Sequence, residues 1–380
     1  MSDAITPFTL AIPQTELDDL ARRIDATRWP EKELVNDWSQ GAPIERVRAL
    51  VDYWRHKYDW RRCEAMLNGF GQFKTEIDGI NVHFLHVRSK HANAMPLLIT
   101  HGWPGSVIEF WKVIGPLTDP TAHGGKAEDA FHVIAPSLPG YGFSSKPAVT
   151  GWNLAHIGDA WIKLMKRLGY DRWVAQGGDW GSGVTTAIGV AKPADCAAIH
   201  VNLPFVFPDA EDMKNLTPAE VKSVEAMNHY RDWENGYSKQ QSTRPQTLGY
   251  SLADSAVGQA AWIYEKMWAW TDHKGTPESI LSYDEMLDNI MLYWLPNTGA
   301  SSGRLYWESF RGVLISVPLE MPVGVSIYPK EIFRASRRWA DKKMKNIIHW
   351  NELDIGGHFA AWEQPELFVK EIRDCFRQCR

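Results

Sequence analysis

The sequence predicts an α/β protein, a mostly parallel sheet with helices on both faces, and three observations support this. Short apolar runs recur along the chain and alternate with stretches of helical periodicity. The run 173–175 leads into residues 177–181, Gly-Gly-Asp-Trp-Gly, in which small residues surround a carboxylate. The alternation then stops between about 206 and 304. That stretch is helical and rich in Tyr and Trp, as expected for a lid inserted between two strands.

The first ninety residues carry helical patterns and then a strand pair. Residues 14–27 place apolar side chains at helical spacing, with Thr15 as the expected N-cap, and residues 43–67 form a second helical pattern. After residue 70 the apolar side chains recur at every second position. Residues 73–77 and 82–87 alternate like strands, and the Asp-Gly pair between them is a hairpin turn signal.

Six further apolar runs complete an expected sheet of eight strands, at 97–99, 132–135, 173–175, 198–201, 323–327 and 346–350. We therefore divide the chain into four parts. These are an N-terminal extension that packs on core and cap (1–70), the first part of an α/β core (71–205), a helical cap (206–304) and the second part of the core (305–380).

Composition limits the classes of partner. The net charge of −5 gives no basic surface for nucleic acid, and no apolar run is long enough to span a membrane. The first residues carry no signal peptide, and the four cysteines have no Cys-x-x-Cys spacing, so we expect a cytoplasmic protein with free thiols and no membrane anchor. Nineteen tryptophans suggest a large aromatic-lined cavity.

The residue at the centre of the 177–181 frame determines the expected chemistry. Small residues on a sharp strand-to-helix turn form the nucleophile elbow G-x-S-x-G of many hydrolases, but here Asp179 replaces the serine. An aspartate is already ionised at neutral pH and can attack a saturated carbon directly. The substitution therefore shifts the expected substrate from esters toward epoxides or alkyl halides.

Other chemistry-bearing motifs also follow strand ends. His-Gly-Trp-Pro-Gly-Ser follows the strand near 100, and Gly-Gly-His-Phe follows the last strand and supplies His358. The chain order nucleophile, acid, histidine is that of the α/β-hydrolase fold, with Asp179 in first place. The acid should follow the strand at 323–327. We favour Glu331, which lies just past that strand, over the alternatives Asp341, Glu352 and Asp354.

These motifs resemble the microsomal-type epoxide hydrolase family, which includes the juvenile-hormone epoxide hydrolases and bacterial relatives. The likeness covers essentially the whole chain, including the N-terminal region with Thr-Arg-Trp-Pro at 27–30. The resemblance implies that Glu331, in Pro-Lys-Glu, is the charge-relay acid. It also implies two cap tyrosines, Tyr237 in Glu-Asn-Gly-Tyr and Tyr306 in Arg-Leu-Tyr, with Tyr250, Tyr264, Tyr283 and Tyr293 as competitors.

The expected reaction converts an apolar, bulky or aryl epoxide to a vicinal diol. Asp179 attacks a ring carbon while two neutral phenols donate to the ring oxygen, and His358 then activates water against the ester. Backbone N–H groups of Trp103 and Trp180 are the expected oxyanion hole, and the side chains of Trp103, Trp180 and Phe359 are expected to contact substrate. The expected partners are a small-molecule epoxide and water, with no metal and no cofactor. A homo-oligomer is left open.

Two rival functions remain. A haloalkane or haloacid dehalogenase uses the same Asp nucleophile, and the indole of Trp180 would then donate to the leaving halide. A non-catalytic member of the fold would only bind an apolar ligand. The two cap tyrosines argue against the first, because a halide leaves without a proton, and the intact catalytic set argues against the second.

Overall fold

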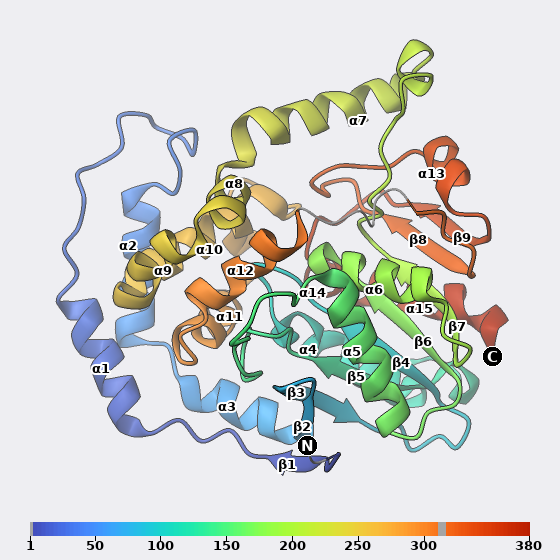
Figure 1. The fold of residues 1–380 in the computed structure, drawn as a ribbon. Coiled ribbons are helices and arrows are strands. Elements are labelled where there is room, and N and C mark those ends of the chain that lie inside the picture. The colour runs from blue at the N-terminus through green and yellow to red at the C-terminus, as the bar shows by residue number, and fades with distance from the viewer. Residues whose placement is uncertain (1–2, 311–316) are drawn as a thin grey trace.

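The computed structural model, which describes residues 3–310 and 317–380, contains one large sheet (Figure 1). Its nine described strands run in the order β1-β2-β3-β5-β4-β6-β7-β8-β9. Their bounds are β1 Thr6–Phe8, β2 Gln72–Ile77, β3 Ile80–Val87, β4 Met95–Thr100, β5 Phe131–Pro136, β6 Trp173–Gly177, β7 Cys196–Val201, β8 Val323–Ile327 and β9 Ile347–Glu352.

The sheet is parallel from β5 to β9 and antiparallel at its N-terminal edge. The expected hairpin is confirmed, because β2 and β3 pair across Asp78 and Gly79, both of which have positive φ angles. The expected number of eight strands is wrong by one. The additional strand is β1, three residues that pair with β2 and are too short to give an alternating pattern.

Helices lie on both faces of the sheet, as expected (Figure 1). On one face α5 (Leu154–Arg167) packs against α6 (Asp179–Ala191), and on the other α4 (Trp111–Thr118) packs against α15 (Pro365–Phe376). The short α14 (Ala360–Glu363) and α13 (Arg337–Lys343) belong to the C-terminal part. Helix α5 shows why these segments are helical. Asn153 caps it by accepting from the N–H groups of Ala155 and His156, and its buried residues recur every three or four positions.

A group of helices between β7 and β8 covers the carboxyl ends of the parallel strands (Figure 1). They are α7 (Pro218–His229), α8 (Gly236–Thr243), α9 (Pro245–Asp254), α10 (Ala256–Trp270), α11 (Tyr283–Trp294) and α12 (Gly299–Ser309). We call this group the lid. Helix α12 packs against α8 and α9, so the expected boundary at residue 304 falls inside a lid helix.

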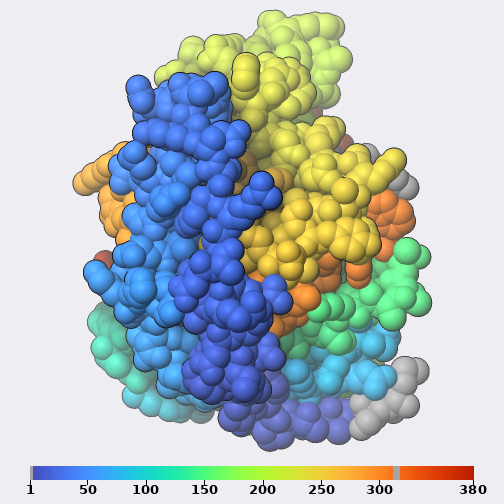
Figure 2. Space-filling view, turned by 90° about the vertical axis from the view of Figure 1, so that its left-hand side faces the viewer, coloured from blue at the N-terminus to red at the C-terminus, as the bar shows by residue number. Residues whose placement is uncertain are grey.

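The N-terminal segment packs against the lid, and Figure 2 shows it in blue beside the yellow lid helices. Its helices are α1 (Gln14–Asp25), α2 (Ile44–His56) and α3 (Trp60–Gly69). The single pattern at 43–67 is thus two helices, because Asp59 caps α3 through the N–H of Arg61. The N-cap of α1 is Pro13, so the expected cap at Thr15 is wrong.

One buried carboxylate ties the N-terminal segment to the lid. Asp288 of α11 accepts from the Tyr58 hydroxyl at 2.8 Å and from the Arg62 guanidinium at 2.7 Å. A buried charge is tolerated only when it is paired and hydrogen-bonded in this way. The N-terminal segment therefore braces the lid over the sheet. None of the helices in the described ranges is both long and apolar enough to cross a bilayer.

Candidate active site

Asp179 is the first residue of α6, directly after β6, and it has a left-handed φ of 47°. Such a φ is uncommon outside glycine and is a feature of a sharp, strained turn. The turn also needs its small neighbours. A β-carbon at Gly177 would overlap the carbonyl of Gly181, and one at Gly181 would overlap the carbonyl of Thr100. The sequence 177–181 thus forms the elbow that the glycine spacing predicts.

The two carboxylate oxygens of Asp179 face different partners. Oδ1 accepts from the backbone N–H of Trp103 at 2.8 Å, and Oδ2 lies 3.4 Å from Nε2 of His358. A β-carbon at Gly102 would overlap this carboxylate, so glycine is required beside it. The backbone N–H of Trp103 therefore lies where an oxyanion donor is expected. Trp180 follows Asp179 within the first turn of α6, where free N–H groups favour negative charge.

His358 joins Asp179 to Glu331. Its Nδ1 lies 2.5 Å from Oε1 of Glu331, which also accepts from the N–H of Ile332 at 2.8 Å. Burial alone would lower the pKa of His358, but the charges of Glu331 and Asp179 outweigh burial and raise that pKa well above its usual value. The two carboxylates therefore favour the protonated form of the imidazole in the free protein.

The structure brings Glu331 to the histidine and leaves the other candidate acids outside. Asp341, Glu352 and Asp354 are all exposed, and Asp341 pairs with Arg337 on α13. The choice of Glu331 from its position after β8 agrees with this geometry. Among the described residues no group of three His, Cys, Asp or Glu side chains is arranged to hold a metal ion.

The lid holds the loop that carries His358. The backbone N–H of His358 donates to the carbonyl of Trp270 at the end of α10, at 2.9 Å, and the two rings meet edge-on with centroids 4.9 Å apart. Glu363 accepts from the N–H groups of Phe359 and Asp272. The position of the imidazole therefore depends on the lid as well as on the sheet.

Two lid tyrosines stand above the carboxylate. The ring of Tyr237 on α8 stacks on the indole of Trp103 at 4.9 Å, and the ring of Tyr306 on α12 meets that indole edge-on at 6.0 Å. Burial raises the pKa of both phenols well above 10, so both are neutral donors. The Tyr306 hydroxyl is buried and makes no hydrogen bond with a described residue.

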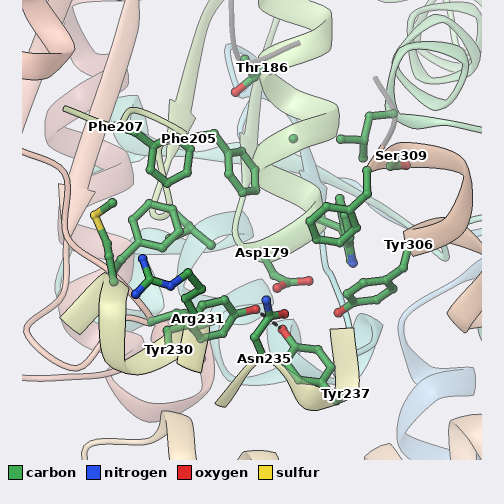
Figure 3. A pocket seen from close by; sticks show the side chains of 18 of the residues that line it. Asp179, Thr186, Phe205, Phe207, Tyr230, Arg231, Asn235, Tyr237, Tyr306 and Ser309 are labelled. Carbon is green, nitrogen blue, oxygen red and sulfur yellow. Dashed lines mark hydrogen bonds between the residues drawn. The ribbon is translucent and has the colours of Figure 1, made fainter. Parts of the chain in front are cut away.

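Asp179 and these phenols face one pocket of about 400 Å³ (Figure 3). Its wall is mostly apolar and aromatic, and its lining includes Leu154, Trp180, Leu203, Phe205, Phe207, Tyr230, Phe310, Ile332 and Phe333. Trp180 thus lies where a substrate-contacting residue is expected. Trp103 and Phe359 do not line this pocket among the described residues. Trp103 instead lies beneath the two phenols, and Phe359 packs against His358.

The competing tyrosines lie elsewhere. Tyr250 is exposed on α9, and Tyr293 of α11 donates to the carbonyl of Gly105 at 2.6 Å. Tyr264 donates to Glu278, and Tyr283 packs against Tyr53 of the N-terminal segment. None of the four lines the pocket within the described ranges. The geometry therefore favours Tyr237 and Tyr306 as the pair.

Sequence reasoning missed two residues of the site. Tyr230 lines the pocket, and its hydroxyl lies 2.9 Å from that of Tyr237. Glu109 interacts with the charges of Asp179, His358 and Glu331, and burial raises its pKa to about 8, with added repulsion from the two carboxylates. Glu109 follows Ser106 by three positions, which is the spacing of a helix capping box, so the sequence favours a structural role for it.

Comparisons with known proteins identify the class and then the family. Residues 95–240 match the model of the alpha/beta hydrolase fold, and residues 5–110 match the model named epoxide hydrolase N terminus. The fold and the elbow therefore define a member of the α/β-hydrolase class. The chain belongs to the epoxide hydrolase family, of the microsomal and juvenile-hormone type that its motifs resemble.

Three relatives illustrate this membership. The chain is 60% identical to a Stigmatella aurantiaca protein named "Putative epoxide hydrolase" over 99% of this chain and 86% of that protein. It is 35% identical to epoxide hydrolase 1 of Sus scrofa over 98% of this chain and 88% of that protein. The crystal structure of juvenile hormone epoxide hydrolase from Bombyx mori superposes with a TM-score of 0.89 and 29% identity, covering 99% and 95% of the two chains.

Proposed function

We propose that this protein hydrolyses epoxides to vicinal diols through a covalent ester on Asp179. The observation that carries the proposal is the pairing of an elbow carboxylate with two neutral phenols across one apolar pocket. The phenols can donate to an oxygen that gains charge, while the carboxylate attacks the carbon that this oxygen leaves. An epoxide carries both atoms side by side, and its oxygen leaves poorly unless it receives a hydrogen bond.

The first step forms the ester. Oδ1 of Asp179 accepts from the backbone N–H of Trp103 at 2.8 Å, whereas Oδ2 lies 3.4 Å from Nε2 of His358, so Oδ2 is the more weakly held oxygen and the one that attacks. The new bond joins Oδ2 to a ring carbon as the carbon–oxygen bond of the ring breaks. The electron pair of that bond goes to the ring oxygen, which takes a proton from Tyr237 or Tyr306. Holding the reacting groups in place in this way avoids much of the entropic cost of bringing them together.

The second step hydrolyses the ester. Water loses one proton to Nε2 of His358 and attacks the ester carbonyl, and the charge on the carbonyl oxygen is stabilised by the N–H groups of Trp103 and Trp180. The bond between the carbonyl carbon and the alkyl oxygen then breaks, and this oxygen leaves with the second proton of the attacking water. Esterification removes the negative charge of Asp179, one of the two charges that raise the pKa of His358. The imidazolium therefore loses its proton more readily after the first step, when a base is needed. That proton passes to the phenolate left by the first step, and His358 is protonated again when it takes the proton from water. The diol then leaves.

The pocket supports apolar, bulky or aryl epoxides as the substrate class. Aromatic and aliphatic side chains form most of its wall, and about 400 Å³ accommodates a ring system or a branched chain next to Asp179. A dehalogenase is the second candidate, because the indole N–H of Trp180 is buried without a partner among the described residues and could donate to a halide. That reaction does not need the two phenols, because a halide leaves without a proton.

The test is a panel of aliphatic and aryl epoxides and haloalkanes of matched size, with diol and halide release measured for wild type and Asp179→Ala. We expect diol from bulky epoxides and no halide release. Halide release without diol would replace the proposal with the dehalogenase. Saturable binding of the epoxides with neither product would instead support a non-catalytic binding protein.

A further inference from the structure

Tyr230 is a third phenol at the site, and its place in the lid is unusual. It begins a π-helical turn, Tyr230–Glu234, that is followed directly by α8 with Tyr237 in its first turn. In a straight α-helix seven residues would separate the two by ~10.5 Å along the axis. Here Asn235 separates the two elements, and the two hydroxyls lie 2.9 Å apart, joined by the dashed line in Figure 3. Single π-turns are frequent at functional sites.

A phenol has one proton, and this limits what Tyr237 can do. If Tyr237 donates to Tyr230, its proton points away from the pocket and cannot reach the epoxide oxygen. If Tyr230 donates to Tyr237, the proton of Tyr237 is free to point to the substrate. Either arrangement is compatible with the distance between the hydroxyls in the free protein. A bound epoxide offers only acceptor sites, so its binding selects the second arrangement.

We propose that Tyr230 is a positioning residue for ring opening, which donates its hydroxyl proton to the oxygen of Tyr237 and thereby aims and strengthens Tyr237 as the donor to the epoxide. The inference rests on the proposed function. Hydrogen bonds in a chain polarise one another, so a phenol that accepts a hydrogen bond is the stronger donor. As Tyr237 gives up its proton, the same contact stabilises the phenolate. Tyr230 keeps its own proton throughout.

Two further observations support this role. Burial raises the pKa of Tyr230 to about 12, so it is protonated and able to donate at any working pH. The Tyr306 hydroxyl, by contrast, makes no hydrogen bond with the described residues, although it lies close enough to Tyr237 to affect the pKa of that phenol. The two donors are thus unequal, because Tyr230 contacts the hydroxyl of Tyr237 and makes no hydrogen bond with that of Tyr306.

A double-mutant cycle on the alkylation step tests the proposal. Ester formation is followed in single-turnover experiments for wild type, Tyr230→Phe, Tyr237→Phe and the double variant, with Tyr250→Phe, an exposed tyrosine of the same lid, as the control. We expect Tyr230→Phe to slow alkylation by about 3- to 10-fold, the value of one neutral hydrogen bond, and to leave the substrate dissociation constant nearly unchanged. In the Tyr237→Phe background the same change should have almost no effect.

Each other outcome has a definite meaning. An equal loss in both backgrounds would show that Tyr230 acts on the substrate or on packing, and would overturn the inference while leaving the proposed function intact. If Tyr237→Phe itself does not slow alkylation, the proposed function fails first. Should Tyr230→Phe not fold, 3-fluorotyrosine at position 230 keeps the ring and offers a more acidic donor. Alkylation at or above the wild-type rate then supports the inference, and a slower rate overturns it.

Discussion

The floor and the roof of this pocket are built on different physical principles. We call floor the groups that follow the parallel strands, namely Asp179, His358 and Glu331. These groups are already paired, because Asp179 lies between the N–H of Trp103 and the ring of His358, and His358 contacts Glu331. We call roof the phenols of Tyr237 and Tyr306, which the lid helices α8 and α12 carry. Their hydroxyl groups make few hydrogen bonds. The Tyr306 hydroxyl makes no hydrogen bond with the described residues, and the Tyr237 hydroxyl contacts that of Tyr230 and lies near that of Tyr306.

This difference indicates what each part does. Buried polar groups in folded proteins nearly always have hydrogen-bond partners, so an unpaired buried hydroxyl that faces a pocket marks a place where a ligand supplies the partner. The roof is therefore arranged for an oxygen atom of the substrate. In the proposed reaction, the floor carries the groups that form the ester and break it. If this division holds, changes in the floor and in the roof should slow different half-reactions.

The largest expected effect is at the centre of the floor. Asp179→Ala removes the nucleophile, and turnover should fall by at least about 10⁴-fold while the fold survives. In a single turnover of wild type in ¹⁸O-water, the label should remain in the enzyme carboxylate and be missing from the first diol. Label in that first diol would mean that water attacks the epoxide directly, and the covalent scheme would be wrong.

Removing the base should separate the two steps. His358→Gln keeps Asp179 as an anion, so it should consume about one epoxide per active site and then stall, with hydrolysis slowed by about 10²–10⁴-fold. Intact-protein mass should rise by the mass of the epoxide, on the peptide that contains Asp179. A folded variant that binds substrate but forms no adduct would show that the histidine is needed before alkylation.

The roof should affect the first step only. Tyr237→Phe and Tyr306→Phe each remove one donor to an oxygen that gains charge, and each should slow alkylation by about 10- to 10²-fold. The double variant should lose much more, and hydrolysis of preformed ester should be little changed in all three. Stopped-flow tryptophan fluorescence suits the measurement, since Trp103 stacks on Tyr237 beside the nucleophile. A double variant that alkylates at the wild-type rate would contradict the role of the phenols and favour the dehalogenase as the function.

The floor could be predicted from the sequence and most of the roof could not. Strand-to-loop positions are fixed by short local patterns, so the glycines around Asp179 and the strand before Glu331 were enough to name both residues. Tyr237 and Tyr306 came from family resemblance, because a helical lid has no comparable local signal. Tyr230 was missed since its role depends on a π-turn that brings two hydroxyls together across seven residues.

Several other features of the structure could not be predicted from the sequence. Trp103 was expected to contact substrate, but in the structure it stacks on Tyr237 and donates its backbone N–H to Asp179. The short β1 and the break between α2 and α3 depend on tertiary pairing and on a single capping aspartate. The pairing of β1 joins segments that are distant in the chain. The pattern at 43–67 fits one long helix as well as two shorter ones. Periodicity alone predicts neither feature.

The smallest expected effect is a change in the pKa of His358, and it tests whether ester formation prepares this residue to act as the base in the second step. Burial works to lower the pKa of His358, and the charges of Glu331 and Asp179 raise it, with Glu331 the larger of the two. Either Asp179→Asn or Glu331→Gln should therefore lower that pKa, and Glu331→Gln should lower it more. The measurement is an NMR titration of the His358 imidazole, with assignments checked against His358→Gln.

The sign of the pH dependence follows from the same charges. Hydrolysis needs neutral His358, so its rate should rise with pH and level off above the pKa of the imidazole in the ester. That pKa should lie below the one in the free enzyme, because the ester has lost the charge of Asp179. Asp179→Asn reproduces this loss without a substrate. Its imidazole should therefore titrate close to the midpoint of the hydrolysis profile, and below the imidazole of the wild-type free enzyme. Equal pKa values in wild type and Asp179→Asn would mean that ester formation does not lower the pKa of His358. The coupling between the two steps would then have to come from another group, and the buried carboxyls Glu109 and Glu363 are candidates.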